Sequence, residues 1–373
     1  MVKLPDDLII LICIHTSESF KETLNLIKNI LGKTYTNHLN FFYEEWFDKH
    51  IFLPEYLRGY FVGDIDKEIM QKSLIISEAD FLNLKLTQFL IDKNMNISIK
   101  NIFYEACMKN CLPVIKYIIK FKETKHDKIN IHTDNEFAFC CACSKGYIDI
   151  VKYLIFLGKH GYSKININVE DDKAFFQACE NGFIDVAKYL IFLGENGYGK
   201  IDIHRGEEYI GETEHIFYSA CVNNHLDIVK YLVFLGENGY NRIDIHALSE
   251  FSFRNACCNG YIDIVKYLIY LGENGYGKFD IHKDRDYAFT YTCYLDRLDV
   301  IKYLVELGKN GYSTEFNTRG GVESLEHLCM CNHIEVVKYL LENGIYTKED
   351  ISSLDIINKV SEDMKKVLTD IKK

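Results

Sequence analysis

The sequence is poor in proline, in positive charge and in long apolar runs. Only three prolines occur in 373 residues and none lies in 114–373, which fits uninterrupted helices over most of the chain. The net charge is −11, so we expect no general affinity for nucleic acid, because neutralising phosphates requires clustered Lys and Arg. No apolar run is long enough to span a bilayer, and the N-terminus lacks a small-residue cleavage site, so we expect a soluble protein without membrane contact.

Motifs of catalysis and metal binding are also missing. No P-loop, nucleophile elbow, HExxH or glycine-rich dinucleotide fingerprint occurs, so we predict that the chain is not an enzyme and needs no cofactor. The thirteen cysteines include no CxxC pair with a second pair suitably placed, and seven of them occupy one repeated position. This pattern indicates packed thiols in a reducing, cytoplasmic compartment rather than zinc ligands.

One pattern is repeated seven times between residues 101 and 345. The tyrosine of a Lys-Tyr-[Leu/Ile] core recurs every 36 residues, except for one spacing of 42, and a cysteine lies ten residues before each copy. The tyrosines are Tyr117, Tyr153, Tyr189, Tyr231, Tyr267, Tyr303 and Tyr339. A fixed period of this size predicts a solenoid of stacked units, each unable to bury its apolar face alone.

Each unit is predicted to contain two helices and a protruding tip. Apolar residues at offsets 0, 3 and 4 mark a first helix that ends at glycine, and offsets 0, 3, 4 and 7 mark a second helix. In one copy these positions are Phe139, Ala142, Cys143 and Gly146, then Ile150, Tyr153, Leu154 and Leu157. An extended stretch such as KINI (164–167) and an acidic tip follow.

This unit resembles the ankyrin repeat over roughly two-thirds of the chain. The family pattern T-P-L-H-x-A-A-x-x-G-H-x-x-x-V-x-x-L-L is matched by K-A-F-F-Q-A-C-E-N-G-F-I-D-V-A-K-Y-L-I at 173–191. The T-P-L-H part is replaced, so the resemblance leaves open how the turn is stabilised. The period of 36 exceeds the family's usual value of about 33, which predicts a second helix one turn longer. The resemblance implies an all-α ankyrin-repeat solenoid whose partners bind the concave surface made by first helices and tips.

The LGENGYGKIDIH style of the repeats, with its bias to Lys, Ile, Asn and Tyr, is similar to that of ankyrin proteins from giant DNA viruses related to mimivirus. That resemblance implies a viral protein acting in the host cytoplasm.

Four regions are expected along the chain. Residues 1–65 form an α-helical N-terminal capping region, 66–100 a degenerate ankyrin-like repeat, 101–345 seven ankyrin repeats and 346–373 C-terminal capping helices. The opening Leu4-Pro5 followed by DDLIILI resembles the start of an F-box, although the same string fits an ordinary capping helix. Ser361 is expected to cap the final helix.

The histidines that close the I-[DN]-I-H phrase are expected to serve structure. They are His132, His204, His246 and His282, and Asn168 stands in the remaining copy. A catalytic or metal-binding histidine would be unique rather than repeated, so this pattern predicts a turn hydrogen bond.

The function expected is a non-enzymatic interaction scaffold, monomeric, that binds a protein partner of basic character. The alternative is a substrate adaptor of a host ubiquitin ligase, which would use residues 1–65. The tip 205–214 carries six extra residues, and insertions in solenoids often project on the binding face. The predicted partner-binding residues are Asp171, Asp172, Glu207, Glu208, Tyr209, Glu212 and Glu214. A merely solvated acidic face and a tolerated surface insertion are the alternatives to this site.

Overall fold

Helices alternate with short turns throughout the computed structural model, which describes residues 99–204, 215–312, 321–353 and 359–371. The described residues contain no strand, so the all-α prediction is confirmed. The last proline, Pro113, lies in the first turn of its helix, where its missing N–H costs nothing. Every helix in these ranges is too short or too polar to cross a membrane.

The chain divides into two units, Met1–Val169 and Glu170–Lys373. The described part of unit 1 consists of two helix pairs. The pairs are α7 (Ile99–Met108) with α8 (Leu112–Thr124), and α9 (Thr133–Ser144) with α10 (Ile148–Lys159).

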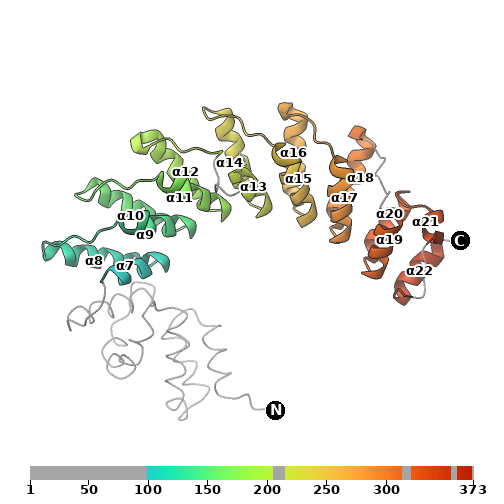
Figure 1. The fold of residues 1–373 in the computed structure, drawn as a ribbon, viewed down its shortest axis with the longest axis horizontal. Helices are drawn as coiled ribbons and strands as arrows, with labels where there is room; N and C mark the ends of the chain where they lie inside the picture. The colour runs from blue at the N-terminus through green and yellow to red at the C-terminus, as the bar shows by residue number, and fades with distance from the viewer. Residues whose placement is uncertain (1–98, 205–214, 313–320, 354–358, 372–373) are drawn as a thin grey trace, which may run out of the picture. The chain divides into compact units, whose positions relative to one another are not determined.

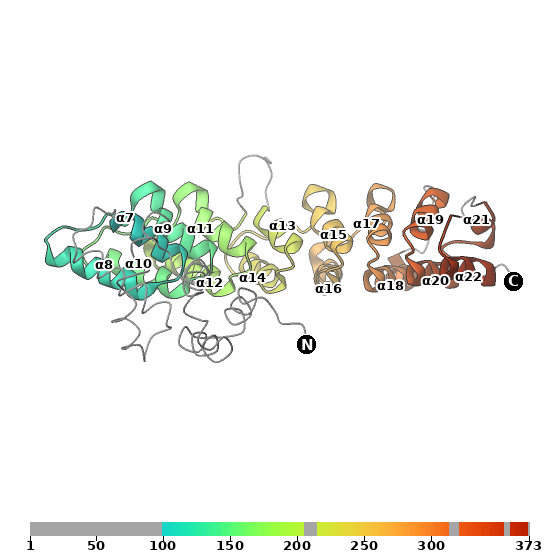
Figure 2. The ribbon, with the colours of Figure 1, turned by 90° about the horizontal axis from the view of Figure 1, so that it is seen from below.

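Unit 2 stacks helix pairs so that first helices form one row and second helices another (Figures 1 and 2). The first helices are α11 (Val169–Glu180), α13 (His215–Val222), α15 (Ala247–Asn259), α17 (Lys283–Tyr294) and α19 (Gly321–Met330). The second helices are α12 (Ile184–Leu193), α14 (Leu226–Glu237), α16 (Ile262–Leu271), α18 (Leu298–Leu307) and α20 (Ile334–Glu342). The final pair is α21 (Lys348–Ser353) and α22 (Glu362–Ile371).

The core between the rows is built from the repeated apolar positions. Phe139, Phe217 and Phe253 are fully buried, each with 0% of its surface exposed, and the repeated cysteines are buried beside them. One prediction is wrong in detail, because Tyr153 lies half-exposed at the edge of α10. Val151 and Ile155 pack inward instead, because the inward stripe of a buried helix is wider than the offsets used to predict it.

The longer second helix is confirmed. Helices α10 and α14 have twelve residues whereas α20, from the copy without the extra residues, has nine. In three other copies a π-helical turn follows instead: η2 (Gly194–Tyr198), η4 (Gly272–Tyr276) and η5 (Gly308–Tyr312). Gly194 is required there, since a Cβ on it would lie 2.9 Å from the carbonyl oxygen of Gly199.

The predicted helix ends agree with the structure. Gly146 ends α9 with a φ of +73°, the left-handed conformation expected of it. Ser361 Oγ accepts the N–H of Met364 at 3.2 Å, so it caps α22 as predicted. The predicted N-terminal capping region, the F-box-like start and nearly all of the degenerate repeat lie outside the described residues.

Candidate interaction surface

The tips are single left-handed turns. In the three tips 134–136, 170–172 and 248–250, three successive residues have positive φ, with values between 49° and 65°. Left-handed geometry costs roughly 1–2 kcal/mol for each non-glycine residue. Such turns therefore need compensating contacts.

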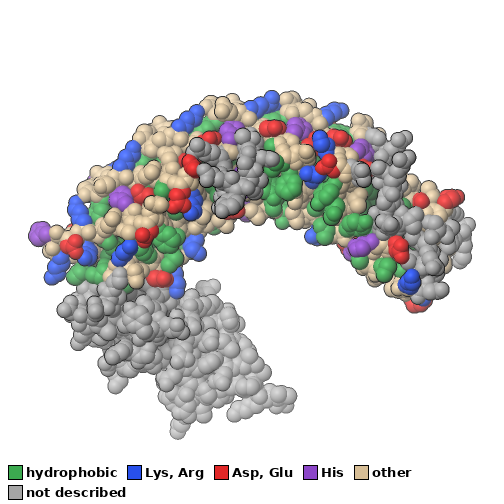
Figure 3. Space-filling view, viewed as in Figure 1, with side chains coloured by type: hydrophobic (Ala, Val, Ile, Leu, Met, Phe, Trp, Pro, Cys, Tyr) green, Lys and Arg blue, Asp and Glu red, His purple; other side chains and the backbone are tan. Residues whose placement is uncertain are grey.

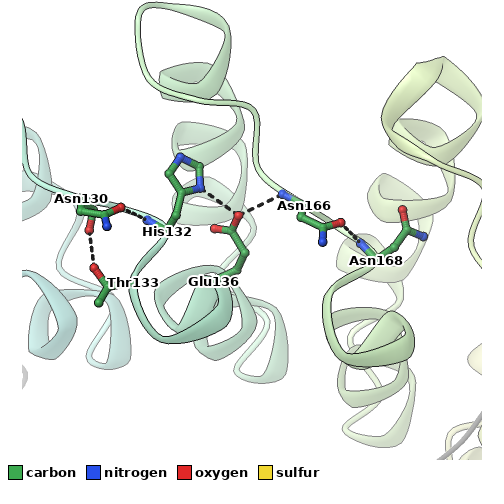
Figure 4. Close-up of polar contacts among 6 residues, drawn as sticks. All are labelled: Asn130, His132, Thr133, Glu136, Asn166 and Asn168. Atoms are coloured by element: carbon green, nitrogen blue, oxygen red, sulfur yellow. Dashed lines mark hydrogen bonds and ion pairs between the residues drawn. The ribbon is translucent and has the colours of Figure 1, made fainter.

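A buried carboxylate supplies those contacts, as Figure 4 shows for unit 1. Glu136 is only 6% exposed. Its Oε1 contacts Nδ1 of His132 at 2.8 Å and accepts the backbone N–H of Asn166 at 3.0 Å. The contact of the His132 ring with Glu136 is the turn hydrogen bond predicted for this histidine, and the backbone N–H of His132 donates to Oδ1 of Asn130 at 3.0 Å. The last acid of the tip thus ties its own turn to the extended stretch of the next repeat.

Unit 2 repeats this arrangement. The backbone N–H of Asp202 donates to Asp172 at 2.9 Å, and that of Asp280 donates to Glu250 at 3.1 Å. Asp286 pairs with Nδ1 of His282 in the same way. We call these residues the acid brackets: Glu136, Asp172, Glu250 and Asp286. Burying a carboxylate costs free energy unless the group is hydrogen-bonded. These buried carboxylates can stabilise the turns because each is paired with a backbone N–H or a histidine ring.

The two described residues of the predicted partner-binding set differ in exposure, because one of them is an acid bracket. Asp171 is exposed at its tip, as the prediction requires. Asp172 is only 4% exposed and is hydrogen-bonded inside the array, so its carboxylate faces the fold rather than solvent. The remaining predicted residues, Glu207, Glu208, Tyr209, Glu212 and Glu214, lie outside the described residues.

Aromatic side chains lie in two groups along the first helices α13 to α19 of unit 2. Figure 3 shows hydrophobic side chains gathered over α15 and α17. Ring centroids are separated by 5.9 Å between His215 and Tyr218, 4.8 Å between Tyr218 and Phe251, 4.1 Å between Tyr287 and Tyr291, 5.8 Å between Tyr291 and Tyr294, and 4.6 Å between Tyr294 and His327.

Arg254 joins the two halves of this row. Its guanidinium carbon lies 5.7 Å from the ring centroid of Phe251 and 5.1 Å from that of Tyr287. We call the whole row the aromatic track: His215, Tyr218, Phe251, Arg254, Tyr287, Tyr291, Tyr294 and His327. Tyr291 is 43% exposed, and Met330 beyond the end of the track is 58% exposed.

Comparison with known families identifies the repeats. The sequence model described as "Ankyrin repeats (3 copies)" matches residues 74–171, 103–205 and 253–351, together more than half of the chain. The chain belongs to the ankyrin repeat family. The matches omit 206–252, the stretch that contains most of the long tip.

Solved structures are similar to this chain, among them the following ankyrin repeat domain. The human ASB11 ankyrin repeat domain is 19% identical, with a TM-score of 0.41, and the match covers 62% of this chain and 96% of that one. No curated protein matches the sequence.

The acid brackets explain how the turns are stabilised without the T-P-L-H residues of the family pattern. In this ankyrin array the T-P-L-H residues are replaced, and the bracket carboxylates with their histidines hold the turns instead. The sequence carried a signal of this, because an acid recurs four residues after each of the four histidines. The prediction treated those acids as exposed charge and so missed their role.

The buried thiols of the described repeats are not reactive groups. Burial raises the pKa of the Cys179, Cys221 and Cys293 thiols well above the ordinary value, and raises that of Cys258 to about 11. Protonated thiols are poor nucleophiles and poor metal ligands at neutral pH. No cluster of three or more His, Cys, Asp or Glu suited to a metal ion occurs in the ranges that the structure describes.

Proposed function

We propose that this ankyrin protein is a scaffold that binds a protein partner of basic character on its first helices and tips, the face that is concave in the family. The observation that supports it most directly is the aromatic track, because Tyr and Arg are enriched at interface hot spots. Ankyrin repeats are in general interaction modules rather than enzymes, which agrees with this assignment.

The charge of the same face supports a basic partner. Helices α11, α13, α15, α17 and α19 carry nine acidic and four basic residues between them, and setting aside the buried Asp172, Glu250 and Asp286 leaves six acidic against four basic. An acidic surface steers a basic partner towards it and disfavours acidic competitors. Asp171 and the long tip at 205–214 belong to this proposed surface, and we expect the protein to act as a monomer in the cytoplasm.

The alternative of a ubiquitin-ligase adaptor depends on residues 1–65. Those residues lie outside the described part of the chain, so the adaptor function stays a hypothesis from the sequence. The viral origin is likewise a hypothesis, which rests on the composition of the repeats.

Site-specific photo-crosslinking tests the proposal. A photoreactive amino acid replaces either Asp171, exposed on the tip of one repeat, or Phe192, 55% exposed on the second helix of that repeat. The full chain is expressed in the cells that make it and irradiated. We expect discrete protein adducts at position 171 and none at position 192. Adducts confined to position 192 would contradict binding on the first-helix face.

A further inference from the structure

The tyrosines of unit 2 form two rows that differ in their contacts with cations. On the second helices, four of the repeated tyrosines are each covered by a lysine of the preceding repeat. The distances from lysine Nζ to ring centroid are 5.8 Å for Lys188 on Tyr231, 5.7 Å for Lys230 on Tyr267, 5.7 Å for Lys266 on Tyr303 and 5.9 Å for Lys302 on Tyr339. These rings already hold a cation from their own chain.

The aromatic track lacks such lysines. Within the described ranges, no lysine or arginine lies over the ring of Tyr218 or Tyr291. Tyr291 is nevertheless 43% exposed, and its ring stacks on Tyr287, so its position is fixed by a neighbour. An exposed, pre-positioned tyrosine face attracts a cation through the ring quadrupole.

Arg254 shows which cation the track accepts. Its planar guanidinium lies between Phe251 and Tyr287 and pairs with Asp284, an acid of the adjoining tip. An aromatic face on one side and a tip carboxylate on the other suit arginine better than lysine. Guanidinium is planar, weakly hydrated and able to stack, whereas ammonium is a strongly hydrated point charge.

We propose that the aromatic track binds an extended, arginine-containing segment of the partner, whose guanidinium groups stack on Tyr218 and Tyr291 on either side of Arg254. This inference rests on the proposed function and specifies the partner's chemistry. The excess of acidic residues on the first helices provides the charge complementarity.

The repeat geometry sets the spacing of the arginines. Packed helices lie about 8–10 Å apart, and an extended chain advances about 3.3 Å per residue. Tyr218 on α13 and Tyr291 on α17 are two repeats apart, roughly 16–20 Å, so arginines about six positions apart in an extended segment meet both rings.

The test measures binding of labelled peptides to the full chain by fluorescence anisotropy. The probes are a peptide of repeated Arg-Gly-Ser units, its Lys-Gly-Ser counterpart of equal charge, and an uncharged proline-rich peptide. We expect the arginine peptide to bind about tenfold more tightly than the lysine peptide, and more tightly than the proline-rich one.

Three variants locate the binding. Tyr291→Gln should weaken the arginine peptide about tenfold, whereas Tyr291→Phe, which keeps the ring, should bind it like the parent. The matched control is Tyr270→Gln, because Tyr270 is 57% exposed on the second helix α16 and should not affect binding. Circular dichroism of all three variants confirms that the fold is retained.

The proposal is overturned if the arginine peptide does not bind, if the proline-rich peptide binds more tightly, or if arginine and lysine peptides bind alike with Tyr291→Gln unchanged. The scaffold function is judged separately by the crosslinks at position 171. Crosslinks there together with no peptide binding would reject the arginine segment and leave the scaffold standing.

Discussion

The two faces of unit 2 are built on the same helix pairs but follow different rules. On the second helices the same residues mostly return: a lysine lies over the next tyrosine, and an exposed aromatic occurs at Phe192, Phe234 and Tyr270. In the last two copies a glutamate, Glu306 or Glu342, replaces that aromatic. On the first helices the outward positions change from copy to copy. The position two residues before the repeated phenylalanine is His215, then Phe251, then Tyr287.

This difference distinguishes positions that hold the stack together from positions that could recognise a partner. Every repeat needs the same packing to its neighbours, so positions that hold the stack together are the same in each copy. A partner is not periodic, and a surface adapted to one need not repeat. The varied face, not the uniform one, is therefore where we place recognition, and the predictions below test that division.

Substitution in the shared core should give the largest loss of stability. Phe253 is 0% exposed, so Phe253→Ala removes a large buried ring and leaves a cavity. We expect a loss of about 3–5 kcal/mol in the free energy of unfolding, measured by urea denaturation. The control is Tyr270→Ala on the exposed edge, which should cost less than about 0.5 kcal/mol. Equal losses in the two variants would remove the distinction between core and surface.

The acid brackets should come next. Glu250→Ala leaves the N–H of Asp280 without the acceptor of a part-buried hydrogen bond, so we expect a loss of about 1–3 kcal/mol. Glu250→Gln keeps an acceptor oxygen in the same place and should lose clearly less. The same denaturation assay compares both variants. An alanine variant as stable as the glutamine variant would show that the bracket does not hold the left-handed turn.

The sequence predicted the periodic features of the fold and missed what depends on neighbouring repeats. The register, the buried Phe139 and the left-handed Gly146 follow from spacing within one copy. Glu136 was taken as tip charge, because its burial requires the N–H of Asn166 from thirty residues further on. The left-handed backbone of the tips could not be predicted from the spacing of side chains, because no repeated side-chain pattern specifies it.

The aromatic track was missed for a related reason. The ring centroids of Tyr218 and Phe251 lie 4.8 Å apart although the two residues occupy different offsets in adjacent repeats. Aligning the copies and comparing columns at offsets −2, +1, +2 and +5 from the repeated phenylalanine would have revealed a run of aromatic residues. The prediction for Asp172 was wrong in a different way: it was predicted to lie on the partner-binding surface because it is an acid at a tip, but its carboxylate is buried.

The buried thiols should make the array sensitive to alkali. The pKa of Cys179 is raised in the folded state above the ordinary 9.0 by burial, so the folded protein holds this proton more tightly than the unfolded one. The resulting stability is fully present below pH 9.0 and is lost as the pH rises towards the folded pKa. Each such thiol should contribute a fall of about 1.4 kcal/mol per pH unit in that window.

Cys179→Ala provides the comparison. The variant should start about 1 kcal/mol less stable at neutral pH, because a small core group is lost. Between pH 9 and 10 it should lose stability more slowly than the parent, and the two curves should converge. Parallel curves in denaturation measured across this range would mean that the thiol of Cys179 ionises as readily in the folded protein as in the unfolded chain.

The smallest effect on stability is expected at the long tip, where binding should change most. His204 and Phe217 are thirteen residues apart whereas other copies span seven, so 205–214 can be exchanged for the four-residue tip Ala-Leu-Ser-Glu of 247–250. Shortening a surface loop by this amount changes its closure entropy by less than about 1 kcal/mol, so thermal unfolding should hardly shift. The exchange removes Glu207, Glu208, Glu212 and Glu214, and a basic partner should bind more weakly and with less dependence on salt. A full-length tip with these four glutamates changed to glutamine separates charge from length. If the glutamine tip keeps the parent affinity while the short tip loses affinity, the tip contributes shape rather than charge. If both variants keep the parent affinity, the partner contacts the first helices without the tip.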